Sequence, residues 1–290
     1  MSNDELAGQP VADTRIKEVV LDPGRRQWMP KDEAELSLPK EEKQVFKKAL
    51  RGLNLARVPY VIGGAFSVYH YSGIWRDTRD LDLFVTPEHK ERALEVLGNL
   101  GYHTWVKHEP WLAKATMEPY FVDIIYGLGN WMAPVDDVWI EKAKAGTFLR
   151  VPTLFAPAEE IIWAKAFIAG RERYDGGDIN HVIQGTKGDL DWLRLMERFK
   201  DQWEVLLFTL VMFRYVYPCH RDYVPNWVMR ELGARLERSI TEEWTGGKLC
   251  RGPLLDGIGT YSPDVERMGY RDARKEIWTK RQMYVISKAA

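Results

Sequence analysis

The chain has 290 residues, 45% of them hydrophobic, and 41 basic against 42 acidic residues give a formal net charge of −1. This length and composition can build two compact units with real cores, and the charge balance creates no strong field for nucleic acid, which stays open as a partner. Cys219 and Cys250 form neither a CxxC motif nor a disulfide framework, and the N-terminus is polar. The most apolar run, Val205–Phe213, is too short to cross a bilayer and predicts a buried helix. We therefore expect a cytoplasmic protein without a membrane partner.

Residues 1–39 are polar and rich in proline, which predicts a loosely ordered N-terminal segment. A helix is expected over 40–53, then a strand at Val58–Ile62, the pair Gly63-Gly64, and a helix that starts near Ala65 and ends at Ser72-Gly73. Glycines between a strand and a helix start allow backbone N–H groups to approach a phosphate at the positive end of the helix dipole. The same pair could equally be a simple turn.

The segment Asp80–Val85 is a short apolar strand pattern that carries two aspartates. Side chains of a strand alternate between faces, so Asp80 and Asp82 project from the same side. Two carboxylates this close repel each other, and their burial is costly unless a cation holds them. The pattern favours a divalent metal site over an edge strand with a solvated acidic face.

A third carboxylate follows later in the chain. A helix is predicted over 87–100 and an extended segment over 102–106, and the next strand pattern, Tyr120–Tyr126, has Asp123 as its single charge. Alone, Asp123 would be as consistent with a strand-end residue as with a ligand. Together with the aspartate pair it predicts three carboxylates that hold two Mg²⁺ ions, or Mn²⁺ instead, which bridge the phosphates of a nucleotide.

From Pro157 onward the pattern becomes helical, with helices expected over 158–170, 178–184, 189–199, 202–216 and 225–238. In the first of these, Lys165 is the single charge on a stripe formed with Ile161 and Ile168. Its ammonium could extend along apolar surface to solvent, or it could reach a cleft and a nucleotide phosphate.

Clustered charges at Arg171–His181 lead into the next helix. Asp178 is a good helix N-cap and Asp175 a good turn residue, but capping does not explain the nearby arginines, of which Arg173 is one. His181 is expected to pack within the helix or to support the site, with general base as the less favoured alternative. Further along, Pro263–Lys280 is predicted to be helical.

Gly63-Gly64, the pair Asp80-x-Asp82 and the later Asp123 resemble the motifs of the nucleotidyltransferase superfamily, the polymerase beta-like group. The chain is most similar to its small-molecule, antibiotic-modifying branch and to its AbiEii-like branch. The resemblance covers residues 58–126 for the motifs and 158–185 more loosely. It implies an α/β (α+β) fold in which a small mixed-sheet catalytic domain at 40–155 precedes a helical domain at 156–240 and a partly helical tail at 241–290.

The resemblance also assigns roles position by position. Asp80 and Asp82 match the metal-binding pair, and Asp123 matches the third acid, which either helps to bind metal or acts as general base. Many members have serine directly after the first glycine, whereas this chain has Gly64 there and its nearest serine is Ser67. The nucleotide-binding set expected on this basis, including two arginines that flank the acidic pair and could equally be exposed loop residues, is Gly63, Gly64, Ser67, Arg76, Arg79, Lys165, Arg173 and Asp178.

The implied function is a Mg²⁺-dependent nucleotidyltransferase, an enzyme that moves a nucleoside monophosphate from an NTP such as ATP to a hydroxyl of a small-molecule acceptor. One alternative is a toxin-type enzyme that acts on tRNA or protein, which the near-neutral charge weakens for tRNA. Another is a nucleotide-binding regulator without turnover. A regulator has little physical reason to keep three repelling carboxylates, so the enzyme is favoured.

Overall fold

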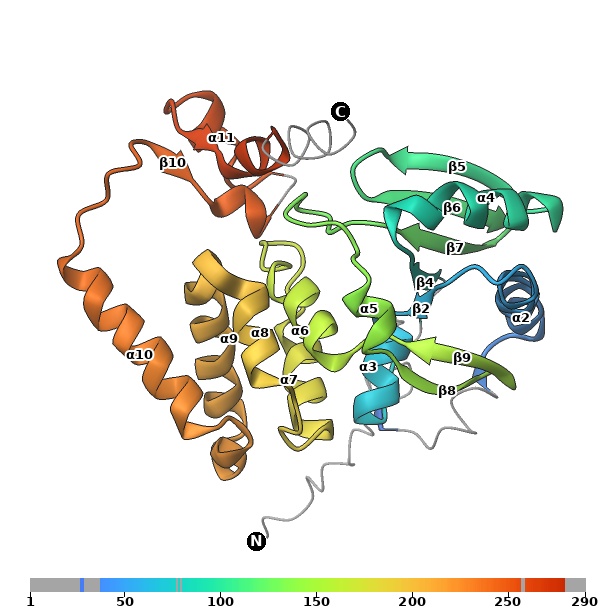
Figure 1. Ribbon diagram of the computed structural model, residues 1–290, viewed down its shortest axis with the longest axis horizontal. Coiled ribbons are helices and arrows are strands. Elements are labelled where there is room, and N and C mark those ends of the chain that lie inside the picture. Colours follow the sequence, from blue (N-terminus) through green and yellow to red (C-terminus); the bar gives the residue numbers. More distant parts are fainter. Residues whose placement is uncertain (1–26, 29–36, 77, 79, 257–258, 280–290) are drawn as a thin grey trace, which may run out of the picture.

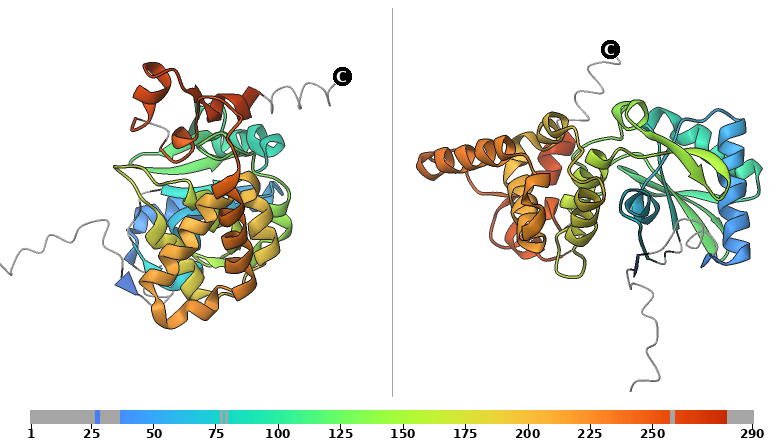
Figure 2. Two further views of the ribbon diagram at one scale, coloured as in Figure 1. Left: turned by 90° about the vertical axis from the view of Figure 1, so that its left-hand side faces the viewer. Right: turned by 90° about the horizontal axis from the view of Figure 1, so that it is seen from below.

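A seven-stranded mixed sheet forms the first half of the protein, and a group of helices follows it (Figure 1). The computed structural model describes residues 27–28, 37–76, 78, 80–256 and 259–279. This arrangement confirms the predicted fold class, an α/β chain in which a mixed sheet precedes a helical part. Figure 2 shows the two parts side by side, with the sheet and α2 on one side and α9 and α10 on the other.

The strand order places the two aspartate-bearing strands next to each other in the middle of the sheet. The order is β5-β6-β7-β4-β2-β9-β8, with β4 parallel to β7 and β2 parallel to β9, and antiparallel pairing elsewhere. The strands are β2 (Val61–Ile62), β4 (Asp80–Phe84), β5 (His103–His108), β6 (Leu112–Met117), β7 (Tyr120–Ile125), β8 (Lys144–Phe148) and β9 (Val151–Phe155). The sequence analysis missed β6, β8 and β9. A further short pair joins β1 (Gln27–Trp28) to β3 (Ile74–Trp75).

Helices α2 (Lys40–Leu55) and α4 (Lys90–Asn99) cover one face of the sheet. Leu81 and Leu83 of β4 are fully buried in this core, whereas Asp80 and Asp82 lie on the opposite face. The apolar partners of the aspartates therefore anchor the strand by hydrophobic burial and leave the carboxylates on the face away from α2 and α4. This confirms the face alternation predicted for the segment.

The glycine pair joins β2 to α3 (Gly64–Ser72), and Gly73, with φ of 69°, ends this helix in the left-handed conformation. Helix α3 packs against α6 (Ala158–Ala166) and α7 (Gly176–Gly185). The expected strand, glycine turn and helix are all present, and α3 connects the sheet to the helical part.

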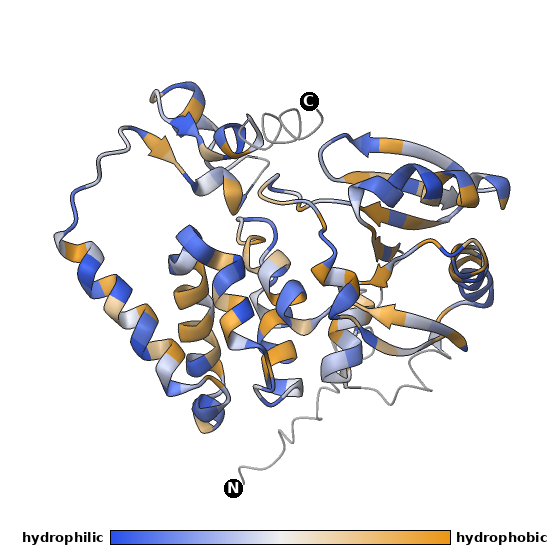
Figure 3. Cartoon of the chain, in the orientation of Figure 1, coloured by the Kyte–Doolittle hydropathy of each residue, from blue (hydrophilic) through white to orange (hydrophobic). Residues whose placement is uncertain are grey.

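The helical part consists of α6 and α7 followed by α8 (Trp192–Phe199), α9 (Trp203–Val216) and α10 (Asn226–Thr241), with short helical turns between them. Figure 3 shows that α9 is mostly apolar along its length. The prediction that Val205–Phe213 is buried is only half correct, because Leu206 and Leu210 are fully buried while Phe208 and Val211 are about half exposed. The helix packs through one face onto its neighbours.

A buried ion cluster fixes α6 against α8. Glu160 on α6 is fully buried, and Arg198 on α8 lies 2.8 Å from it and also donates two hydrogen bonds to Asp136, at 2.5 and 2.8 Å. Arg194 of α8 pairs with Glu159 in the same way. Charges taken out of water need such partners, and the pairs fix the position of the helix that carries Lys165.

The C-terminal tail crosses back over the helical part. The predicted helix over Pro263–Lys280 is interrupted: α11 (Ser262–Glu266) ends before Gly269, whose φ is 74°, β11 (Arg271–Asp272) follows, and residues 273–279 are helical again. Lys280 lies outside the described residues. Leu254 is buried in the helical core, and Asn130 donates to its carbonyl at 3.3 Å. The tail is thereby attached to the loop that follows β7.

Most of the predicted N-terminal segment at 1–39 lies outside the described residues. Among those that are described, no helix is both long and apolar enough to span a membrane. Strand β9 ends at Phe155 and α6 begins at Ala158, which is where the change from mixed to helical structure occurs.

Candidate active site

Three aspartates from two neighbouring strands meet on the face of the sheet away from α2 and α4. Asp82 of β4 stands directly opposite Asp123 of β7 in the parallel pairing, and Asp80 lies one pleat away. One carboxylate oxygen from each of the three lies within 4.8 Å of the others. Asp123 is buried and the other two are half buried. The structure thus brings together the three acids that the sequence analysis placed in one site.

The glycine turn lies against this acidic group. Gly63 donates its N–H to the Asp82 carbonyl at 2.9 Å, and Gly64 has φ of 54°. A Cβ atom on Gly64 would lie only 1.7 Å from Oδ2 of Asp82, so a side chain there would collide with the carboxylate. Glycine is required at this position both for the left-handed conformation and for the close approach.

The donor set fits a divalent cation. Hard cations such as Mg²⁺ and Mn²⁺ prefer carboxylate oxygens, and a group of three that share one site supplies them. The missing side chain of Gly64 allows the Asp82 carboxylate to occupy its position in this group. Asp80, Asp82 and Asp123 are therefore the residues that would hold the metal.

Burial and mutual repulsion dominate the electrostatics of the acids. Burial, followed by the charges of Asp80 and Asp123, raises the pKa of Asp82 to about 7, although Lys165 and Arg173 oppose this. Burial also raises the pKa of Asp123, and the hydrogen bond and charge of Lys114 work in the opposite direction. The negative charges of these carboxylates are thus only partly balanced by neighbouring cations of the protein. A bound divalent cation would reduce their mutual repulsion.

We expect Mg²⁺ to stabilise the protein more at about pH 8 than at about pH 6. Because the folded pKa of Asp82 lies above the ordinary value of 3.8, its protonated form favours the fold, and this contribution is lost as the pH rises through about 7. Mg²⁺ competes with that proton and restores stability above pH 7. Melting temperatures measured with Mg²⁺ and with EDTA at both pH values test this. The pH dependence of the gain should be absent in Asp82→Asn, and an equal gain at both pH values in the wild type would contradict it.

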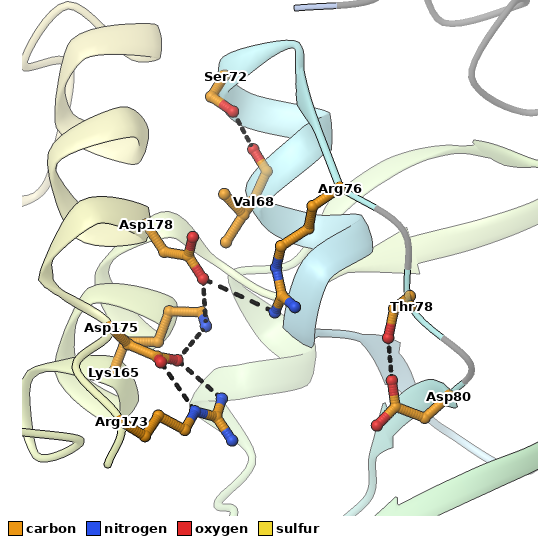
Figure 4. Close-up of polar contacts among 9 residues, drawn as sticks. All are labelled: Val68, Ser72, Arg76, Thr78, Asp80, Lys165, Arg173, Asp175 and Asp178. Carbon is orange, nitrogen blue, oxygen red and sulfur yellow. Dashed lines mark hydrogen bonds and ion pairs between the residues drawn. The ribbon is translucent and has the colours of Figure 1, made fainter. Parts of the chain in front are cut away.

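Lys165 is almost completely buried, with 6% of its surface exposed, and its charge acts on Asp82. Figure 4 shows its ammonium between Asp175 and Asp178. Its ammonium donates to Asp175 at 2.6 Å and to Asp178 at 2.8 Å. Extension to solvent, the alternative left open by the sequence, is therefore wrong. The capping alternative for Asp178 is wrong too, because α7 begins at Gly176 and the Asp178 side chain turns toward Lys165.

Two arginines join the same pair of acids from opposite sides (Figure 4). Arg173 donates to both oxygens of Asp175, at 2.8 and 2.9 Å, and Arg76 lies 3.8 Å from Asp178. Burial would raise the pKa of Asp175, but the hydrogen bonds and charges of Arg173 and Lys165 outweigh it and hold this pKa well below its usual range. The result is a group of three cations around two carboxylates, in which Lys165 and Arg173 are held by short hydrogen bonds and Arg76 by a longer ion pair.

Other predicted site residues lie elsewhere or outside the described residues. Ser67 is fully buried and its hydroxyl donates to the Ile62 carbonyl at 2.5 Å, so its observed contact holds the turn between β2 and α3 together. Arg79 is outside the described residues. His181 is half buried on α7, and its role as an alternative general base stays a prediction.

The sequence analysis missed three residues of this site. Lys114 of β6 stands directly opposite Asp123 and donates to it at 2.5 Å, Asp175 holds Lys165 and Arg173, and Thr78 donates to Asp80. A single lysine among apolar and small residues in Leu112–Met117 was the available signal for Lys114. It is recognisable only once this segment is known to be a strand paired with β7.

Comparison with known proteins gives distant structural likeness only. No family model and no curated protein matches the chain. Similar solved structures include the antibiotic-resistance factor ANT(2'')-Ia (TM-score 0.41, 15% identity, covering 64% of this chain and 98% of that one). Others are the lincosamide antibiotic adenylyltransferase LnuA bound to lincomycin (0.36, 17%, 50% and 96%) and JHP933 from Helicobacter pylori (0.35, 13%, 71% and 100%).

Proposed function

We propose that this protein is a nucleotidyltransferase that uses a divalent cation, Mg²⁺ or Mn²⁺, to move a nucleoside monophosphate from an NTP to a hydroxyl of a small molecule. The observation that carries this proposal is the convergence of Asp80, Asp82 and Asp123 against the Gly63-Gly64 turn. Carboxylates in such a group serve phosphoryl chemistry by holding cations, and a glycine turn at a helix start accommodates phosphate.

The cationic group supplies the other half of a triphosphate site. Lys165 and Arg173 are close enough to Asp82 to act on its charge, so the triphosphate of an NTP at the acids also comes within reach of these cations. Arg76 pairs with Asp178 at the long distance of 3.8 Å, which leaves its guanidinium able to shift toward a phosphate. The carboxylates of Asp175 and Asp178 keep these side chains oriented before the nucleotide arrives.

The reaction is an in-line displacement at the α-phosphorus. The acceptor oxygen forms the new bond to phosphorus, the bond to the bridging oxygen of the β-phosphate breaks, and pyrophosphate leaves. The bound cation supplies charge neutralisation on the phosphate oxygens. Asp123 receives the hydroxyl proton, with His181 as the alternative base, and Lys165 and Arg173 balance the charge that develops on the leaving group.

A small-molecule acceptor agrees with the charge of the chain. A nucleic-acid substrate is normally held by a surplus of lysine and arginine that contact its phosphates, and this chain has a net charge of −1. The cations near the site are already paired with Asp175, Asp178 and Asp123. They match the charge of one triphosphate better than that of a long polyanion.

The donor site is tested by melting the protein with each of the four NTPs, with and without Mg²⁺. A ligand that binds only the folded state raises the melting temperature. At a concentration 100 times its Kd it adds about 2.7 kcal/mol to the free energy of unfolding. We expect a Mg²⁺-dependent increase with one or two of the NTPs in the wild type and none in Asp82→Asn. The same increase in both proteins, or none with any NTP, would contradict the proposed donor site.

A further inference from the structure

The pairing of Lys114 with Asp123 is not required by any step described above. Lys114 lies on β6 directly opposite Asp123 on β7, and its ammonium donates to Oδ1 of Asp123 at 2.5 Å. The same nitrogen lies 4.1 Å from the centre of the Phe121 ring. Only 14% of the lysine side chain and 11% of the aspartate side chain are exposed. The ammonium is therefore held by a carboxylate and an aromatic face in a largely dry site.

This buried ion pair adjoins the acidic group. Asp123 shares its row of the sheet with Asp82, so Lys114, Asp123 and Asp82 follow one another across three neighbouring strands. One oxygen of Asp123 is already within 4.8 Å of oxygens of the other two aspartates. A cation that bound Oδ1 of Asp123 would have to take the place of the lysine nitrogen, which lies 2.5 Å from that oxygen.

We propose that the ammonium of Lys114 is a built-in cation that competes with divalent metal for Asp123, so that Asp80 and Asp82 form the main metal-binding pair. The inference rests on the proposed function, because it assumes that the acidic group binds metal. A fixed positive charge beside one of three ligands both occupies a ligand oxygen and repels an incoming cation.

A purely structural lysine would behave in the opposite way. If Lys114 served only to hold β6 and Asp123 in place, its removal would disorder a metal ligand and weaken metal binding. If it competes with metal, its removal frees Asp123 and strengthens metal binding. The sign of the change in metal affinity therefore separates the two roles.

The experiment is a titration of the full chain with Mn²⁺, followed by electron paramagnetic resonance, for the wild type, Lys114→Met, Lys114→Gln and Lys114→Arg. Lys107→Met is the matched control, because Lys107 is exposed on β5 and also acts on the charge of Asp123, but from farther away. Thermal melts with and without Mn²⁺ establish that each variant is folded. The neutral variant with the higher melting temperature is the one whose Mn²⁺ affinity is compared with that of the wild type.

We expect the neutral variants to bind Mn²⁺ at least about tenfold more tightly than the wild type, and Lys114→Arg and Lys107→Met to stay within about twofold. Unchanged or weaker binding in the neutral variants overturns the inference while the metal site itself stands. Absence of Mn²⁺ binding in every protein of the series overturns the proposed function as well. Binding in the neutral variants alone supports the inference in its strongest form.

Discussion

Replacing Asp82 with asparagine is expected to lower nucleotidyl transfer by at least about 1,000-fold, equivalent to about 4 kcal/mol of transition-state stabilisation. Asp82 stands between the other two acids, in register with Asp123 and on the same strand face as Asp80. Asparagine has nearly the same shape but no charge, so it removes attraction for a cation without opening a cavity. Pyrophosphate release from the preferred NTP with a hydroxyl acceptor is the measurement.

The control for this variant is Asp201→Asn, which makes the same change in net charge at an exposed position away from the site. It should keep full turnover. Because neutralising Asp82 relieves carboxylate repulsion, the Asp82 variant should melt at a temperature equal to or above that of the metal-free wild type. Turnover that survives in Asp82→Asn would show that these acids do not carry the chemistry.

Gly64→Ala is expected to lower turnover by about 100-fold, since a misplacement of about 1 Å at a catalytic group has an effect of this size. The new methyl group would lie 1.7 Å from Oδ2 of Asp82, so either the carboxylate or the turn must move. Either movement changes the position of the Asp82 carboxylate relative to Asp80 and Asp123. Steady-state rates together with the Mn²⁺ affinity of the variant measure the effect.

Gly247→Ala is the matched control for the backbone conformation. Gly247 has φ of 65°, close to the 54° of Gly64, but a Cβ atom there meets nothing within 4 Å. Alanine in the left-handed region costs about 1 kcal/mol at either position. Gly247→Ala should therefore lose this much stability and keep its turnover and Mn²⁺ affinity. Equal activity losses in both variants would contradict the proposed collision with Asp82.

The two groups of charge around the site form one electrostatic unit. Asp80, Asp82 and Asp123 are repelling acids, whereas Lys165, Arg173 and Arg76 are cations held in place by Asp175 and Asp178. Lys165 and Arg173 already act on Asp82 in the metal-free protein. Under the proposed function, a nucleotide triphosphate with its cation would complement both groups at once, with the metal at the acids and the phosphates at the cations.

The local pattern of the sequence was sufficient for the first part of this site. Alternation along a strand is a property of the backbone, so Asp80-Leu81-Asp82-Leu83 alone placed both acids on one face and both leucines in the core. The strand, glycine pair and helix that contain Gly63 and Gly64 follow from equally local preferences. Asp123 was the single charge in its strand pattern, and only together with the aspartate pair did it become a candidate third ligand.

Tertiary structure decided the partners of these residues. Lys114 became part of the site only through the register of β6 on β7, and Lys165 was recognised as a buried partner of Asp175 and Asp178 only when α6 and α7 had been packed together. The sequence determined which face each charged side chain occupies, because that depends on a few neighbouring residues. Which charges meet across strands and helices depends on pairing and burial over the whole chain, since a buried charge adopts the position where an opposite charge compensates its lost hydration.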